Sequence, residues 1–497
     1  MGASLYEFDA HDQADLLRRG EVTATDLAQA HLDRIERWDA DLRSFVTLTP
    51  EAALDAARAI DRAGRAGEGF AGVPTAVKDL TATAGVRTTM GSRLLADQVP
   101  EVDAHVVRLV RDAALVSLGK TNTPEFGLSS YTDNDLVGPT STPWRVGLNA
   151  GGSSGGAAAA VAAGLVPWAL GSDGGGSIRI PSSCCGVVGL KPTRGRVSPG
   201  PLGSDWSGLA SDGPIARTVR DVAALLDLIA VPQPGDARFV GRPAEPFAAV
   251  VDREPGRLRV AAWGDPYLPD VATDPRVKAV WEDGCRALAA LGHDVEVIDN
   301  PFPPELEPQF NVVWSSGMAA APIPPEAEPL LRPNTRYWRR RGATHSAAEL
   351  AGAMQFLETT TRSAMSSLAD YDVFCTPTLA MLPQPHAWFT ATDDPAEAHR
   401  RELLFTPFTA VDNMAGIPAA SVPFGRADGL PVGLMLAAHA GHETTLLSLM
   451  GQLEASVAWP TAPVDPVEDI RSKTHDDGLR HLSQPKSIIL RHPGDRE

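Results

Sequence analysis

The chain has only four cysteines in 497 residues, and no two of them form a C-x-x-C pair. Cys184 and Cys185 are adjacent, while Cys285 and Cys375 lie far along the chain. Disulfide frameworks and zinc sites both need several cysteines at characteristic spacings, so this set supports neither. We therefore expect four reduced cysteines that are buried as small apolar side chains.

Long apolar segments and an excess of positive charge are also missing. No segment approaches the ~18 consecutive apolar residues of a membrane-spanning helix, and the first residues, MGASLYEFDAHDQ, lack the basic and apolar regions of a secretory signal. The formal net charge of -18 aids solubility and repels phosphate backbones. We expect a cytoplasmic protein with no membrane and no nucleic-acid partner.

Helical and extended patterns alternate at both ends of the chain. After Thr23, which can cap a helix together with Asp26, apolar residues recur at helical spacing to about Arg37. A short extended run, 73–77, ends at Lys78. The further elements that we expect are helices at 105–115 and 446–453 and strands at 116–119, 372–375, 418–423 and 432–438. With 43% hydrophobic and 21% charged residues, this alternation is typical of a folded α/β protein.

The middle and the end of the chain have weaker patterns. Between about 232 and 395 the sequence is rich in proline, as at 301–308 and 322–333, and we expect substrate specificity to vary there. Residues 463–497 are polar and charged, which predicts a poorly ordered C-terminal extension. Length alone would suggest about three domains of ~150 residues each.

Two glycine-rich loops carry the candidate chemistry. The loop GGSSGG at 151–156 precedes the alanine-rich run 157–163, so its serines either cap a helix or lie in a loop whose amides hold an anion. The second loop, 171–181, contains three glycines directly before Ser177. Exposed N–H groups beside a serine hydroxyl are what acyl transfer requires, although a glycine-rich turn with a buried serine is the alternative.

A nucleophilic serine needs a base, and no histidine lies between His105 and His293. Lys78, at the end of an expected strand, offers another base. A desolvated lysine can lose its proton near neutral pH. The alternative is an ordinary lysine whose charged end reaches solvent.

Five motifs, taken together, resemble the amidase signature family. They are GVPTAVKD at 72–79, GKTNTPEF at 119–126, GGSSGG at 151–156, GSDGGGSIRIPSSCCGVVGLKPTRGRV at 171–197 and GLPVGLML at 429–436, in the family's order. The resemblance extends from about residue 5 to residue 458. It implies a single large α/β/α domain around a mixed, twisted sheet, at 1–462, with a catalytic core at about 70–230 and 370–458 and a variable substrate region at about 232–395.

The same resemblance implies a Ser-Ser-Lys triad and a hydrolase that acts on C–N bonds other than peptide bonds, with no metal and no cofactor. Lys78 would take a proton through Ser153 from the nucleophile Ser177, which forms an acyl-enzyme with a carboxylic amide. The bond Gly152–Ser153 would be cis. Backbone N–H groups would form the oxyanion hole at Gly174, Gly175 and Gly176. The family's usual threonine is replaced by Gly174, so the shape of this hole is expected to differ.

The natural substrate is less defined by the sequence. The run KPTRGRVSPGPL at 191–202 is similar to the subgroup that includes 6-aminohexanoate cyclic dimer hydrolase, which suggests small linear or cyclic amides. By family position, Ser129, Ser130 and Tyr131 are expected to bind the substrate. A homodimer is one expected state of assembly.

Three rival interpretations remain. Residues 152–156 satisfy G-x-S-x-G, which would make Ser154 the nucleophile of an α/β-hydrolase, but TSTPWRVGLNA before them lacks strand character. The chain could also be the glutaminase-type subunit of a tRNA amidotransferase. The third interpretation is a non-catalytic binding protein on an amidase scaffold, although Lys78, Ser153 and Ser177 are all present.

Overall fold

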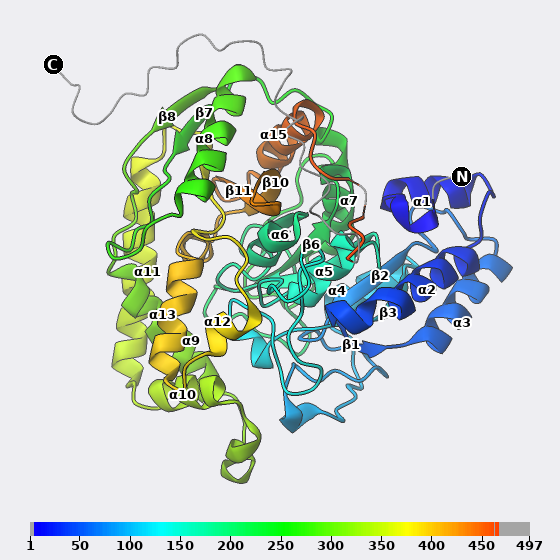
Figure 1. Cartoon of the computed structure of the whole chain (residues 1–497), viewed down its shortest axis with the longest axis horizontal. Helices are drawn as coiled ribbons and strands as arrows, with labels where there is room; N and C mark the ends of the chain where they lie inside the picture. Colours follow the sequence, from blue (N-terminus) through cyan, green and yellow to red (C-terminus); the bar gives the residue numbers. More distant parts are fainter. Residues whose placement is uncertain (1–3, 462, 467–497) are drawn as a thin grey trace.

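A computed structural model describes residues 4–461 and 463–466 of the chain, and within them eleven strands form one continuous sheet. The order of the strands across the sheet is β1-β3-β2-β4-β6-β5-β10-β11-β9-β7-β8 (Figure 1). The strands are β1 (Phe45–Leu48), β2 (Pro74–Lys78), β3 (Val116–Thr121), β4 (Trp168–Asp173), β5 (Val188–Lys191), β6 (Ser211–Ala216), β7 (Arg259–Ala262), β8 (Asp294–Val297), β9 (Val373–Pro377), β10 (Ala419–Ala427) and β11 (Leu430–Ala438).

The sheet is mixed, as predicted. Strand β2 runs parallel to β3 and β4, and β7 runs parallel to β8 and β9, whereas the other neighbouring pairs are antiparallel. The helices are α1 (Ala10–Arg18), α2 (Ala24–Leu42), α3 (Pro50–Arg62), α4 (His105–Asp112), α5 (Gly155–Ala162), α6 (Arg179–Cys185), α7 (Val219–Ile229), α8 (Pro275–Ala290), α9 (Leu306–Ala319), α10 (Pro333–Gly342), α11 (Ala347–Ser367), α12 (His386–Thr390), α13 (Pro395–Phe405), α14 (Ala410–Ala415) and α15 (Glu443–Ser456).

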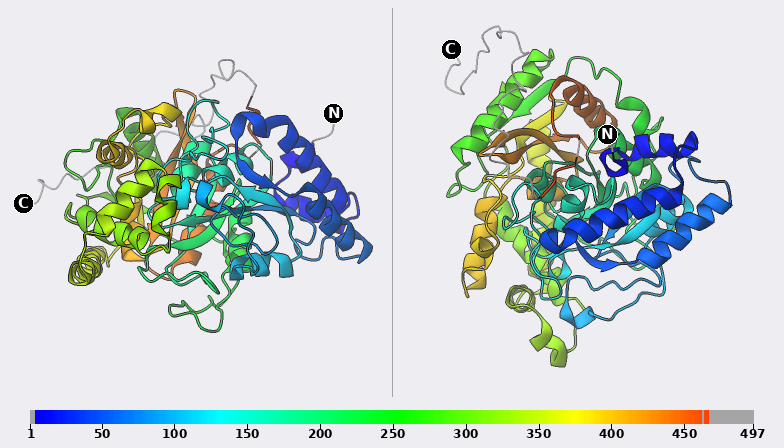
Figure 2. Two further views of the ribbon diagram at one scale, coloured as in Figure 1. Left: turned by 90° about the horizontal axis from the view of Figure 1, so that it is seen from below. Right: turned by 45° about the vertical axis from the view of Figure 1, so that its right-hand side comes forward.

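Helices cover both faces of the sheet, which confirms the predicted α/β/α fold. Successive residues of a strand point to opposite faces. On β11, a Cβ at Gly433 would lie 2.8 Å from the Cβ of Ser183 in α6, whereas the next residue, Leu434, lies against Gly284 in α8. Helices α6 and α8 therefore pack on opposite faces. The N-terminal helices lie at one end of the molecule and α9 to α11 at the other (Figure 2).

The N-terminal helices form as their sequence predicts. Thr23 and Asp26 make a complete capping box at the start of α2. The helix continues past Arg37 to Leu42, because Trp38 and Leu42 extend its buried face. The other predicted helices and strands are also present, with boundaries shifted by a few residues.

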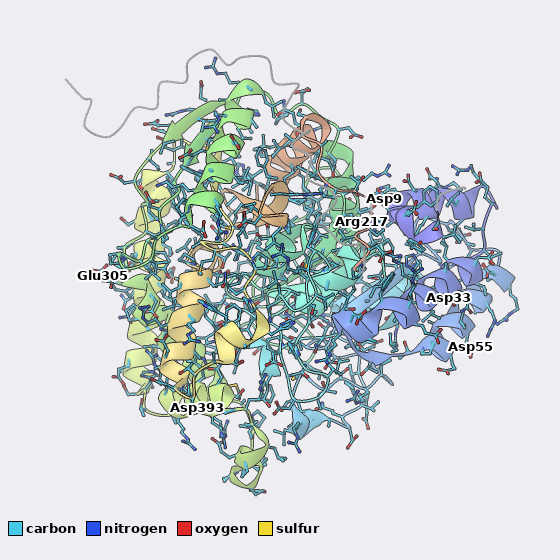
Figure 3. All side chains as sticks on the ribbon, viewed as in Figure 1. Asp9, Asp33, Asp55, Arg217, Glu305 and Asp393 are labelled. Carbon is cyan, nitrogen blue, oxygen red and sulfur yellow. The ribbon has the colours of Figure 1, made fainter. Side chains whose placement is uncertain are left out.

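Arg217 attaches the N-terminal segment to the sheet. It follows β6 and donates a hydrogen bond to the carbonyl oxygen of Phe8 at 2.7 Å. Figure 3 shows it where α1 meets the body of the molecule. Arg217 is 1% exposed, so this contact is part of the core rather than a surface ion pair.

Helix α5 runs through the interior, and all eight of its residues are buried. Its small residues permit this position. A Cβ at Gly156 would lie 2.3 Å from the backbone nitrogen of Asn122 and 2.4 Å from the carbonyl oxygen of Ser44. Because no larger residue fits there, the GGSSGG loop at the start of α5 is held deep in the molecule.

The proline-rich middle region contributes to the sheet. Its strands β7 and β8 pair with each other, and β7 also pairs with β9, so that they complete one edge of the sheet. This participation was not visible in the weak sequence pattern between 232 and 395.

Within the described residues, all four cysteines are buried and free, and no helix is long and apolar enough to span a membrane. The expected C-terminal extension begins with attached residues, since the Val464 N–H donates to the Ala162 carbonyl at 2.8 Å. Residues 467–497 lie outside the described part of the chain.

Candidate active site

Two buried parallel strands bring the lysine to the glycine loops. Strands β2 and β4 pair in parallel through Val77 and Leu170, so their carboxyl ends meet at the same edge of the sheet. Lys78 is the last residue of β2, and Ser172 lies near the end of β4. The Lys78 Nζ lies 3.1 Å from the Ser172 carbonyl oxygen and 3.0 Å from its Oγ.

The third contact of the Lys78 Nζ is the Ser153 Oγ, at 2.8 Å. Lys78 is 0% exposed, and burial lowers its pKa from the usual value to about 7, against the opposing effects of Asp173 and Asp212. A neutral amine has two N–H donors and one lone pair. Donation of both hydrogens to Ser172 leaves the lone pair free to accept from the Ser153 hydroxyl. The contacts therefore match the inventory of a neutral lysine base.

The GGSSGG loop presents Ser153 to Lys78 and turns Ser154 away. The Gly152–Ser153 peptide bond is cis, as the resemblance implied. Ser154 does not cap α5 through its side chain, and its Oγ instead donates to the Ser172 carbonyl at 3.1 Å. The backbone N–H of Ser154 donates to the Ser177 carbonyl at 3.0 Å. Ser154 thus joins the two loops. The loop before Gly152 is not a strand, so the α/β-hydrolase elbow lacks its structural context.

Ser177 lies at the end of the second loop, and 8% of its surface is exposed. Its Oγ makes no hydrogen bond within residues 4–461 and 463–466, and it lines a cavity of about 90 Å³. Ser177 and Ser153 are therefore not directly hydrogen-bonded. Bonds between catalytic groups often tighten only when a substrate is present.

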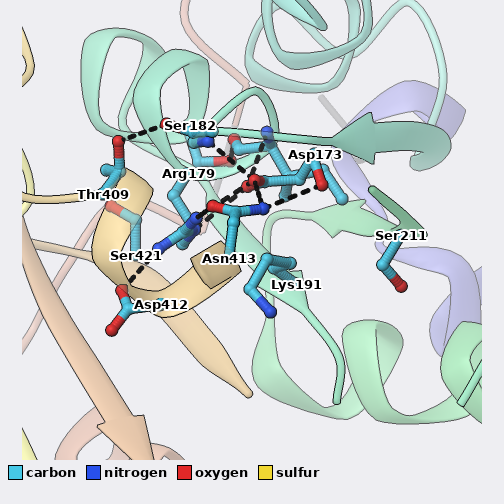
Figure 4. Close-up of polar contacts among 12 residues, drawn as sticks. Asp173, Arg179, Ser182, Lys191, Ser211, Thr409, Asp412, Asn413 and Ser421 are labelled. Carbon is cyan, nitrogen blue, oxygen red and sulfur yellow. Dashed lines mark hydrogen bonds and ion pairs between the residues drawn. The ribbon is translucent and has the colours of Figure 1, made fainter. Parts of the chain in front are cut away.

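A buried ion network holds the Ser177 loop in place (Figure 4). Asp173 accepts hydrogen bonds from the backbone N–H groups of Gly176 at 2.7 Å and Ile178 at 3.1 Å. Arg179 donates to both oxygens of Asp173 at 3.0 Å and to Asp412 at 2.6 Å. Burial alone would raise the pKa of Asp173, but Arg179 more than offsets this and holds it well below its usual range.

The three glycines before Ser177 differ in their surroundings. The N–H of Gly176 is engaged by Asp173, while those of Gly174 and Gly175 have no acceptor in the described part of the chain. A Cβ at Gly174 would lie 3.1 Å from the ring of Trp314. This contact gives a physical reason for glycine where the family usually has threonine.

Gly176 has a second reason to be glycine. Its φ is +128°, and a Cβ there would lie 2.1 Å from the Thr409 Oγ1. The Thr409 hydroxyl donates to the Gly175 carbonyl at 2.7 Å, which fixes the peptide beside it.

The predicted substrate residues line two adjoining cavities. Ser129 and Ser130 line the cavity at Ser177, together with an aromatic wall. Tyr131 lines a second cavity of about 210 Å³, which shares Leu128 and Ser129 with the first. The aromatic wall consists of Phe310, Trp314 and Trp338.

Several polar residues of the site had no role assigned from the sequence. Asp173 and Arg179 stand within the second loop motif, where an acid and a base around glycines could have indicated an internal ion pair. Asp412 and Glu402 lie more than 220 residues farther along the chain, and no local pattern marks them. No cluster of His, Cys, Asp or Glu in the described residues could hold a metal ion.

Comparison with known proteins gives consistent matches over most of the chain. The family model described as Amidase matches residues 26–447. The chain is 35% identical over 482 residues to the 6-aminohexanoate-cyclic-dimer hydrolase of Paenarthrobacter ureafaciens, covering 91% of this chain and 95% of that protein. It is 37% identical over 486 residues to a glutamyl-tRNA(Gln) amidotransferase subunit of Moorella thermoacetica, covering 92% and 98%. A solved structure of 6-aminohexanoate cyclic dimer hydrolase superimposes with a TM-score of 0.87 at 31% identity, covering 94% of this chain and 100% of that one.

Proposed function

Because the chain belongs to the amidase family, whose members hydrolyse C–N bonds other than peptide bonds, we propose that Ser177 cleaves a small carboxylic amide through a covalent acyl-enzyme. Lys78 and Ser153 are the proposed proton relay. The observation that carries this proposal is a buried lysine with a pKa of about 7, in direct contact with the Ser153 hydroxyl at 2.8 Å.

Acylation begins with neutral Lys78. Its Nζ accepts the Ser153 proton as Ser153 accepts the proton of Ser177, and the Ser177 Oγ forms a bond to the amide carbon. The negative charge that develops on the carbonyl oxygen needs preorganised donors. The N–H groups of Gly174, Gly175 and Gly176 are proposed to supply them. The engagement of the Gly176 N–H by Asp173 favours the other two.

Collapse of the tetrahedral intermediate breaks the C–N bond. The leaving nitrogen takes a proton from the Ser153 hydroxyl, which recovers one from Lys78, and an amine or ammonia departs. Water then gives a proton to the same relay and attacks the ester carbon. The acid is released, and Ser177 and neutral Lys78 are restored.

Labelling with a fluorophosphonate probe tests the nucleophile. Peptide mass spectrometry should locate the adduct on Ser177 in the wild type and in Ser154→Ala, and Ser177→Ala should carry none. An adduct on Ser154 would refute the assignment. Absence of both labelling and amide turnover would favour the non-catalytic binding protein.

A second candidate is the glutaminase-type subunit of a tRNA amidotransferase, favoured by the 37% identity to one such protein. L-glutamine carries an α-carboxylate, but no arginine or lysine is among the described residues that line the cavity at Ser177. We therefore rank this function second. Release of ammonia from L-glutamine, faster than from simple amides and dependent on added tRNA and partner chains, would reverse the order.

The single domain at 1–462, its core at about 70–230 and 370–458 and its substrate region at 232–395 remain proposals. They are supported by the single sheet, to which all the strands of the described residues belong. A cytoplasmic location is supported by four free cysteines. A homodimer remains a proposal for light scattering to test. The net charge of -18 still gives no reason to expect a nucleic-acid partner.

A further inference from the structure

A buried carboxyl group lies in the wall of the cavity that contains the nucleophile. Glu402, on α13, lines this cavity together with Ser177 and is 7% exposed. Its Oε2 accepts a hydrogen bond from the Ser130 backbone N–H at 2.7 Å. The Ser130 hydroxyl, which is also buried, has no hydrogen-bond partner in the structure.

Glu402 has no cationic partner among the described residues. Its Oε1 accepts no hydrogen bond from them, and no lysine or arginine shares the cavity wall. An ionised carboxylate can accept about four hydrogen bonds, and a buried charge without a partner costs several kcal/mol. The molecule thus leaves a buried acceptor open toward the space that a substrate would occupy.

The neighbouring titratable groups do not neutralise Glu402. His399, on the same helix, lies 3.4 Å from the Glu307 Oε1 and 3.3 Å from the Asn311 side chain. Tyr131 lies close enough for Glu402 to raise its pKa, but burial already keeps that phenol neutral. Burial also raises the pKa of Glu402, with a weaker opposing effect from His399. A cation beside Glu402 would favour the ionised form.

Aromatic rings complete the surroundings of this carboxyl group. Phe310 and Trp314 stack at 5.4 Å between ring centroids and line the same cavity, as does Trp338. The faces of aromatic rings attract ammonium groups, and tryptophan does so best. A carboxylate within an aromatic wall is a combination suited to an organic cation.

We propose that Glu402 binds an ammonium group carried by the substrate, so that the preferred substrates are small amides with a protonated amine. The inference rests on the proposed function for the place of bond cleavage. Binding of the ammonium group itself needs no catalysis. The two can therefore be tested separately.

Calorimetric titration tests the binding alone. Butylammonium chloride should bind to the full-length Ser177→Ala protein, whereas 1-pentanol, similar in size but uncharged, should bind at least about tenfold more weakly. Glu402→Gln in the same background keeps an acceptor for the Ser130 N–H and should lose the binding. Equal affinity for the two ligands, or unchanged affinity in Glu402→Gln, would overturn the inference.

Glu397→Gln is the matched control. Glu397 lies on the same helix, and its side chain is 41% exposed and pairs with Arg401. The variant removes one negative charge from α13 without changing the cavity. Its affinity for butylammonium should equal that of the parent protein. A loss as large as that of Glu402→Gln would mean that general charge, and not the proposed contact, attracts the cation.

Kinetics then connect the subsite to turnover. Anilides whose acyl or amine part ends in an ammonium group are compared with anilides that end in a methyl group. Glu402→Gln should lower kcat/KM about tenfold or more for an ammonium substrate and little for its methyl counterpart. Equal losses, or no ammonium preference on either side of the amide, would refute the inference even if hydrolysis occurs. Conversely, butylammonium binding through Glu402 without hydrolysis of any amide would refute only the proposed function.

Discussion

The hydrolytic rate should rise with pH as Lys78 loses its proton. The perturbation is a change of pH from about 5 to 9 at constant ionic strength, and the quantity measured is kcat/KM for a chromogenic anilide. Lys78 is the group of the relay whose pKa lies near 7, because burial disfavours its charged form. Below that pKa the base is protonated and cannot accept a proton from Ser153.

The expected magnitude follows from one titration. With a pKa of about 7, kcat/KM should fall about tenfold for each pH unit below 7, so that about 1% of the plateau rate remains at pH 5. Above about pH 8 the rate should become constant. An ordinary exposed lysine, with its pKa near 10.4, would instead give a rate that still rises at pH 9.

Asp212 offers a way to move this titration without touching the triad. It pairs with Ser172 across β6 and β4, and Lys78 contacts Ser172. The Asp212 charge raises the pKa of Lys78, and burial raises the pKa of Asp212 itself to about 6. Asp212→Asn should therefore shift the acidic limb of the profile to lower pH, while Asp55→Asn, at a side chain that is 78% exposed, should not.

The comparison has a clear failing result. Stopped assays on the wild type, Asp212→Asn and Asp55→Asn would be fitted to a single ionisation. A rate that is independent of pH between 5 and 8 would refute a lysine base. A limb that moves to higher pH in Asp212→Asn would refute the sign of the electrostatic argument. Lys78→Ala should lose turnover at every pH yet keep the wild-type circular dichroism spectrum.

Three further substitutions test the parts of the site. Ser153→Ala should lower kcat about 10²- to 10⁴-fold, and Ser154→Ala should be milder because its Oγ only bonds a loop carbonyl; the reverse order in steady-state assays would favour the elbow. Arg179→Met leaves two buried carboxylates unpaired and should lower the free energy of unfolding by about 3 to 5 kcal/mol in urea titrations; a loss below 1 kcal/mol would contradict this. Gly174→Thr should push on Trp314, 3.1 Å from the Cβ position, and destabilise by about 1 to 3 kcal/mol, with a higher KM; wild-type stability and KM would refute the contact.

Local patterns were sufficient to predict much of the fold. The capping box of Thr23 and Asp26 and the extended run that ends at Lys78 each depend on a few consecutive residues. The α/β class followed from the alternation of such elements. The triad residues came from motif resemblance, and the structure brings Lys78 and Ser153 into contact at 2.8 Å. Their catalytic roles remain predictions.

Features that depend on distant partners could not be predicted. Strand β8 has only four residues, partly or fully exposed, so its apolar pattern is weak. Asp412 meets Arg179 across 233 residues. Glu402 enters the cavity wall because α13 packs beside the Ser130 loop, across 272 residues. In each case the contact is set by tertiary packing and leaves no local signal.

The buried ion network explains how a neutral lysine can lie beside an aspartate. Asp173 raises the pKa of Lys78, and as a free carboxylate it would favour the protonated lysine, which is useless as a base. The structure gives Asp173 a cation of its own, since Arg179 bonds both of its oxygens. The charge of Asp173 is thereby compensated away from Lys78, and its remaining acceptor capacity shapes the loop through Gly176 and Ile178. One ion pair thus serves both the geometry of the nucleophile loop and the protonation state of the base.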